Sequence, residues 1–228
     1  EFEGLRFRDP DTRWYNISSM LGAARNFDRN SPQILDFYAA KIAENVKGGR
    51  RTLLIAKKKF LGVCRSYLCQ RLQELGVAVD IVTEKWAEAD LSDPRTLPLI
   101  NYGVSGVNVF ENFDAAYCLT GYYISDSVLR DSVFDLDPTF ERFPIRIQTS
   151  SPPAQRKAVV ALPDDRQTIL PHVAQWLLDQ MEADVVVQAV GRVRPFTSPC
   201  EVITFHNGRL PTVDFDFEFT NLEGARQH

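Results

Sequence analysis

The sequence predicts an α/β protein with a mainly parallel sheet, and three observations predict it. Residues 52–56 form a short apolar run that is typical of a strand buried on both faces. An amphipathic segment over residues 60–75 and a second apolar run over residues 77–82 follow within about thirty residues, the length of a right-handed parallel crossover. Strand-like and helix-like segments then continue to alternate, as in a sheet with helices on its faces.

The first third of the chain is predicted to contain a lead-in, a helix and this crossover. Residues 1–30 receive no assignment beyond a lead-in. Ser31 and Pro32 predict a helix start, as N-cap and first helical residue, and Gly48 predicts the helix end. Gly76 is expected to end the amphipathic segment of the crossover.

Periodicity and turn residues assign the remaining segments. They predict strands at residues 97–102, 115–123 and 200–205, and helices at 125–135 and 171–181. Residues 136–157 contain four prolines and are predicted to be an insertion or an extended loop across a face. Residues 213–219 alternate between apolar and acidic side chains, which predicts an edge or antiparallel strand. We expect a lead-in with the first helix at residues 1–49 and an α/β domain at 50–228.

Composition excludes several classes of protein. The chain has 228 residues, 44% of them hydrophobic and 25% charged, which is ordinary for a globular domain. No run of about eighteen apolar residues occurs and no signal peptide is recognisable, so we expect a cytoplasmic protein without membrane contact. The net charge of −4 argues against a free-standing basic nucleic-acid binder but leaves room for a local basic cleft. Because the chain begins without methionine, we expect it to be part of a longer protein.

Metal, disulfide and hydrolase chemistry have little support in the sequence. The four cysteines form no C-x-x-C pair, and we expect them to be reduced thiols. With three histidines a histidine-rich metal site is not expected. Asp214, Asp216 and Glu218 share one face of the predicted C-terminal strand, where a solvated acidic face is favoured over a metal site. No G-x-S-x-G nucleophile motif occurs.

The segment from Gln188 to Pro195 is the strongest candidate site. Read as a helix, Gln188 and Arg192 share one face, while Pro195 disfavours the helical conformation for Arg194. Gly191 leaves room for close approach between two guanidiniums and an amide, a set that suits a phosphate-bearing ligand. The alternative is that the arginines form surface salt bridges.

Two loops are weaker candidates. Lys57, Lys58 and Lys59 follow the strand at residues 52–56, at the sheet edge where ligands gather in open α/β folds, although a solvated turn is the alternative. The loop at residues 101–114 presents two closely spaced glycines, which can expose backbone N–H groups to an anion or form an ordinary turn.

The ordered string Gln188-x-x-Gly191-Arg192-x-Arg194 resembles motif VI of superfamily two helicases and translocases, which read Q-x-x-G-R-x-x-R. Here the last arginine comes one residue earlier. Residues 52–60 are similar to motif IV, and the segment from Ser105 to Asn108 is similar to motif V. The three motifs occur in the family's order over residues 50–206.

This resemblance implies a RecA-like three-layer sandwich and a role as the C-terminal motor domain of an ATP-dependent helicase. Arg192 and Arg194 would be arginine fingers, and Gln188, Gly191, Asn108 and Gly106 would contact the nucleotide. Lys57, Lys58, Lys59 and Ser105 would grip the nucleic-acid backbone, DNA in preference to RNA.

The resemblance also implies what lies outside this chain. Neither a G-x-x-x-x-G-K-[ST] loop nor a D-E-x-[HD] box occurs. An N-terminal RecA-like domain of the same full-length chain would therefore hold most of the ATP and Mg²⁺, and this chain alone would be inactive. The alternatives are a degenerate RecA-like module that binds nucleic acid or protein without catalysis, and a Rossmann-type transferase, for which no dinucleotide fingerprint is present.

Overall fold

A parallel sheet organises the molecule. The computed structural model describes residues 9–106, 108–136, 144–150, 155–160, 170–207, 210 and 213–228. Within these residues a seven-stranded sheet has the order β3-β4-β2-β5-β8-β1-β9, and every neighbouring pair is parallel. Its strands are β1 (Arg13–Ile17), β2 (Thr52–Ala56), β3 (Asp80–Val82), β4 (Thr96–Asn101), β5 (Ala115–Cys118), β8 (Glu201–Thr204) and β9 (Phe217–Phe219).

Helices cover both faces of this sheet, and α4 is the longest on its face. The helices are α1 (Ala24–Lys47), α2 (Leu61–Glu74), α3 (Asp126–Leu136), α4 (Leu170–Val190) and α5 (Leu222–Gln227). Side chains alternate along β2, so that Leu54 belongs to the core on the face covered by α1, α2 and α5, while Leu53 belongs to the core beneath the second half of α4. The predicted α/β class is confirmed, and its layers are those of a RecA-like sandwich.

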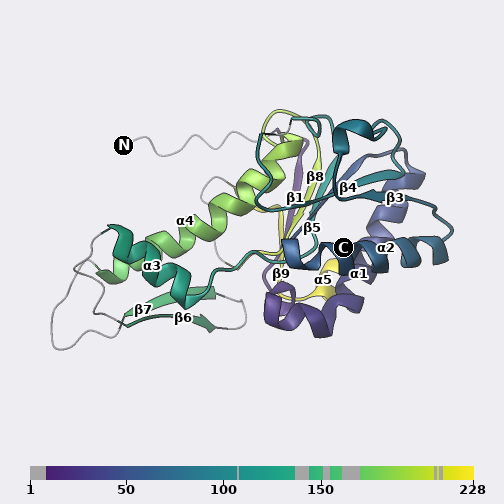
Figure 1. Cartoon of the computed structure of the whole chain (residues 1–228). Coiled ribbons are helices and arrows are strands. Elements are labelled where there is room, and N and C mark those ends of the chain that lie inside the picture. The colour runs from purple at the N-terminus through teal and green to yellow at the C-terminus, as the bar shows by residue number, and fades with distance from the viewer. Residues whose placement is uncertain are drawn as a thin grey trace.

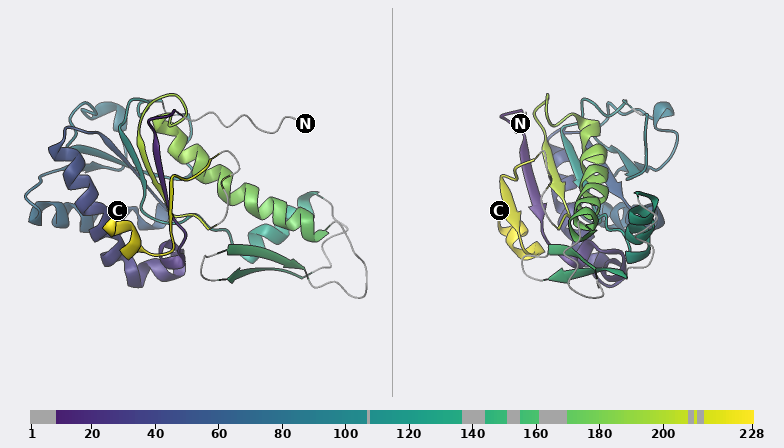
Figure 2. Two further views of the ribbon diagram at one scale, coloured as in Figure 1. Left: turned by 180° about the vertical axis from the view of Figure 1, so that it is seen from behind. Right: turned by 90° about the vertical axis from the view of Figure 1, so that its left-hand side faces the viewer.

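A smaller lobe extends from the sandwich (Figures 1 and 2). Strands β6 (Ile145–Ser150) and β7 (Gln155–Val160) form an antiparallel ribbon. This ribbon and α3 pack against the first half of α4 around a core of their own. Helix α4 therefore belongs to both parts: its first half supports the lobe, and its second half covers the sheet.

The start predicted for the first helix is wrong. Helix α1 begins at Ala24, and Pro32 lies inside it. Phe27 is fully buried and its ring centroid lies 4.5 Å from that of Phe60, so packing against the 3₁₀ turn that precedes α2 holds the turns before the proline. Ser31 is itself buried in the helix instead of capping it. The predicted end is confirmed, because Lys47 is the last helical residue.

Other segments also differ from their predicted form. Part of the lead-in forms β1, which lies between β8 and β9 in the sheet. The segment at 136–157, expected to be an insertion or an extended loop, contains most of the antiparallel ribbon, while residues 137–143 and 151–154 lie outside the described part. Of the two predictions for the C-terminal strand, the edge position is confirmed, because β9 lies at the edge of the sheet. The antiparallel alternative is wrong, because β9 pairs parallel with β1.

Candidate anion-binding site at the end of helix α4

The end of α4 positions the predicted arginines. Helix α4 stops at Val190 and continues as a 3₁₀ turn, Gly191–Val193. Val193 is fully buried and fixes this turn against the sheet. Arg194 adopts a left-handed conformation with φ 55°, and its N–H donates to the Gly191 carbonyl at 3.0 Å. The helix thus ends before Pro195, as its restriction on the preceding residue predicts.

The loop from β4 to β5 forms the opposite wall. The Gly103 N–H donates to the Asn101 side chain at 2.8 Å, and Gly106 has a φ of 70°, a conformation that favours glycine. Phe110 and Phe113 are buried in the core beneath α4, and their rings pack edge to face with their centroids 5.6 Å apart. These two aromatic side chains hold the loop against the end of α4.

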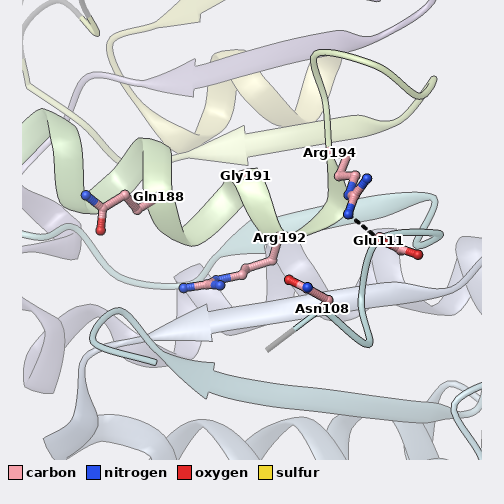
Figure 3. A pocket seen from close by; sticks show the side chains of 6 residues that line it. All are labelled: Asn108, Glu111, Gln188, Gly191, Arg192 and Arg194. Atoms are coloured by element: carbon pink, nitrogen blue, oxygen red, sulfur yellow. Dashed lines mark ion pairs between the residues drawn. The ribbon is translucent and has the colours of Figure 1, made fainter. Parts of the chain in front are cut away.

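A pocket of about 360 Å³ lies between these two segments (Figure 3). It is lined by Asn108, Glu111, Gln188, Gly191, Arg192 and Arg194. Arg192 Nη2 donates to the Val104 carbonyl at 2.7 Å, and Arg194 Nη2 lies 2.6 Å from Glu111 Oε2. Residues that are about eighty positions apart in the sequence therefore contact one another across one pocket.

The lining of the pocket suits an anionic ligand. Two guanidiniums and one carboxylate leave a local formal charge of +1, and the side-chain amides of Gln188 and Asn108 add hydrogen-bonding groups. The helix C-terminus carries partial negative charge, so an anion here depends on the guanidiniums. A Cβ added to Gly191 would meet no atom within 4 Å, so this position opens onto space that a ligand can enter.

The predicted lysines do not line this pocket. Lys57 Nζ donates to the Tyr123 carbonyl at 2.9 Å and lies 5.3 Å from the centre of the Tyr122 ring, at the base of the lobe. Burial lowers the pKa of Lys57, and the nearby Glu182 opposes that shift. Lys58 and Lys59 are exposed, at the carboxyl end of β2. The triplet therefore separates into one structural cation and two accessible ones.

The remaining predicted residues lie close to the pocket but outside its lining. Ser105 and Gly106 are exposed in the loop between Val104, which accepts from Arg192, and Asn108. The fold thus brings Asn108 together with four predicted residues at the end of α4, namely Gln188, Gly191, Arg192 and Arg194. Ser105 and Gly106 lie on the loop beside this pocket and do not line it.

Sequence reasoning missed Glu111 and the Val104 carbonyl. Glu111 lies in the loop that resembles motif V, but the resemblance assigns it no role. Two signals were available: it is three residues from Asn108, and it is flanked at 110 and 113 by the large apolar side chains that anchor the loop. A backbone acceptor such as Val104 has no signature in side-chain chemistry, because every residue has a carbonyl.

The C-terminal carboxylates have structural contacts. Asp216 Oδ2 accepts the Trp14 N–H at 2.7 Å, and Glu218 Oε1 accepts from Asn16 Nδ2 at 3.2 Å, so both help to hold the edge strand. Among the described residues no group of three or more His, Cys, Asp or Glu side chains is placed to hold a metal ion.

The fold and the pocket define an α/β protein with an arginine-lined pocket between the end of a helix and a loop of the sheet. No protein-family model, no curated protein and no solved structure matches the chain. No helix in the described part is long and apolar enough to cross a membrane.

Proposed function

We propose that this chain is the second, C-terminal motor domain of an ATP-dependent nucleic-acid helicase or translocase. The observation that carries the proposal is the shared pocket: segments resembling motifs V and VI supply its two walls, and both arginines of the second segment line it. The parallel sheet with helices on both faces is the architecture that such a domain requires.

In this proposal Arg192 and Arg194 act on ATP phosphates that a first RecA-like domain presents. Phosphoryl transfer accumulates negative charge on the γ-phosphoryl oxygens, and a positioned arginine contributes roughly 10³–10⁵ in rate. Arg192 has the better support, because its hydrogen bond to Val104 fixes the guanidinium in the pocket. Mg²⁺ would be held together with the ATP by the first domain.

The nucleic-acid contact is proposed for Lys58, Lys59 and Ser105. All three side chains are exposed on loops that follow parallel strands, the edge where ligands bind in open α/β sheets. Lys57 is left out of this set, because its ammonium group is bound inside the molecule. Two accessible lysines supply a modest electrostatic contribution, so the first domain would have to provide much of the affinity.

The test is ATP hydrolysis by the full-length protein that contains this domain, with and without single-stranded DNA. Replacement of Arg192 with alanine should lower kcat by roughly 10³-fold or more, because the transition-state charge loses its guanidinium. Arg95→Ala is the matched control, since Arg95 forms an exposed pair with Asp93 at 2.8 Å outside the pocket. Turnover that Arg192→Ala leaves intact would contradict the finger role.

The same measurement distinguishes the motor domain from the alternative, a degenerate module that binds without catalysis. A degenerate RecA-like module would bind DNA with no ATP turnover in any variant. The observation that favours it is the Arg194–Glu111 pair, which engages one of the two proposed fingers within the chain.

A further inference from the structure

Glu111 places a carboxylate inside a pocket that otherwise suits anions. Its Oε2 lies 2.6 Å from Arg194 Nη2, and both residues line the pocket (Figure 3). Phe110 and Phe113, on either side, are buried, so the loop cannot move away from the end of α4 without exposing them. The carboxylate is therefore held where a ligand phosphate would meet Arg194.

The pair is built so that its side chains can separate while the backbone stays in place. The backbone of Arg194 is fixed at three points, because its N–H donates to Gly191 and its carbonyl accepts from Thr197 and Ser198, each at 3.0 Å. The side chains of Arg194 and Glu111 are 54% and 40% exposed, so water is ready to solvate either partner. An exposed pair of this kind contributes at most about fivefold to an equilibrium constant.

We propose that Glu111 is an internal competitor for Arg194, a carboxylate that occupies the guanidinium until a polyphosphate replaces it. The identification of the ligand as the phosphate chain of a nucleotide rests on the proposed function. Glu111 acts through Arg194 and is a positioning residue. It keeps the guanidinium at the pocket wall, and it favours highly charged ligands over weakly charged ones by at most about fivefold, because a weakly charged ligand gains less from Arg194 than opening the pair costs.

The experiment measures binding of inorganic tripolyphosphate to this chain by calorimetry. Glu111→Gln keeps the size and removes the charge, and it should tighten binding about two- to fivefold. The gain should be smaller when Arg194→Ala is also present, because Glu111 then has no guanidinium to release and only its direct repulsion of the phosphate remains. Glu111→Asp should return the affinity toward that of the native chain.

The matched control is Glu74→Gln. Glu74 forms an ion pair with Arg71 at the same 2.6 Å, with side chains that are similarly exposed at 46% and 40%, but on helix α2. This control should leave tripolyphosphate binding unchanged. A purely structural role for Glu111 would lower the affinity in both arginine backgrounds and would not be rescued by aspartate.

The outcomes separate this inference from the proposed function. If Arg192→Ala abolishes binding while Glu111→Gln leaves the affinity unchanged or weakens it, the anion site stands and the competitor is overturned. If neither the native chain nor Glu111→Gln binds tripolyphosphate, both the competitor and the phosphate role of the pocket are overturned.

Discussion

Two arginine–glutamate pairs lie near the middle of α4 and just beyond its C-terminal end, and their burial differs sharply. At the base of the lobe Arg156 lies 3.0 Å from Glu182, with side chains that are 9% and 3% exposed. In the pocket Arg194 lies 2.6 Å from Glu111, with side chains that are 54% and 40% exposed. The shorter distance belongs to the more exposed pair, so distance alone does not rank them. Burial determines whether such a pair maintains the fold or is available for exchange with a ligand.

The buried pair connects three parts of the molecule. Glu182 of α4 accepts the Ile124 N–H at 2.8 Å, and Arg156 of β7 donates to the Ile124 carbonyl at 2.7 Å. Lys57, at the end of β2, donates to the neighbouring Tyr123 carbonyl. The segment that leads from β5 to α3 is thus fixed from the sheet, the ribbon and the long helix at once. This contact sets where the lobe lies relative to the sandwich.

Breaking the buried pair should have the largest effect. Arg156→Ala leaves the Glu182 carboxyl buried without its partner, and it should lower the free energy of unfolding by about 3–5 kcal/mol. The measurement is urea denaturation at pH 8, followed by circular dichroism. Arg95→Ala, which opens the exposed pair with Asp93, should leave the free energy of unfolding nearly unchanged.

A double variant makes this comparison more specific. Replacing both partners, as in Arg156→Met with Glu182→Leu, removes both charges and should recover most of the stability, because the desolvation cost disappears with them. A loss as large as that of the single variant would mean that the pair's hydrogen bonds to Ile124, and not its charges, hold the lobe.

The second largest effect should be a pH dependence of stability that comes from the buried carboxyl group of Glu182. Burial raises the pKa of Glu182 to about 7 from an ordinary 4.5, against the opposing effects of Arg156 and Lys57. Between these values the folded protein binds more protons than the unfolded chain, so this group makes stability fall as pH rises from about 4.5 to about 7. Above pH 7 its contribution is constant.

Glu182→Gln removes this titration. The free energy of unfolding of the native chain, minus that of the variant, should fall by up to about 3 kcal/mol between pH 4.5 and 7.5. Urea denaturation at several pH values measures it, with Glu74→Gln as an exposed control. A difference that is flat across this range would show that Glu182 ionises normally in the folded protein.

The sequence predicted the sheet and the pocket better than it predicted the lobe. The strand at residues 52–56 and the helix after it were clear because burial on two faces and a 3.6-residue period both leave strong patterns. The family resemblance predicts that Gln188, Arg192 and Asn108 contact the same nucleotide, and all three line one pocket in the structure.

The errors have identifiable physical causes. Pro32 was read as a helix start because proline suits a first turn, but packing of Phe27 extends the helix through it. The prolines of residues 136–157 predict an insertion or an extended loop and give no sign of the two strands of the ribbon. The partner of Arg156 lies 26 residues away on α4. Long-range ion pairs such as Arg194–Glu111 leave no local pattern, so they were not predicted.

The pocket pair should give the smallest change in stability. Glu111→Ala and Arg194→Ala should each alter the free energy of unfolding by no more than about 1 kcal/mol, because both side chains are solvated once separated. Glu74→Ala, in the equally short pair with Arg71, should behave alike, and urea denaturation compares the three. A loss above about 2 kcal/mol for Glu111→Ala alone would place this pair with Arg156–Glu182 as part of the fold. A ligand could then not readily displace Glu111, and the contrast between the two pairs would be lost.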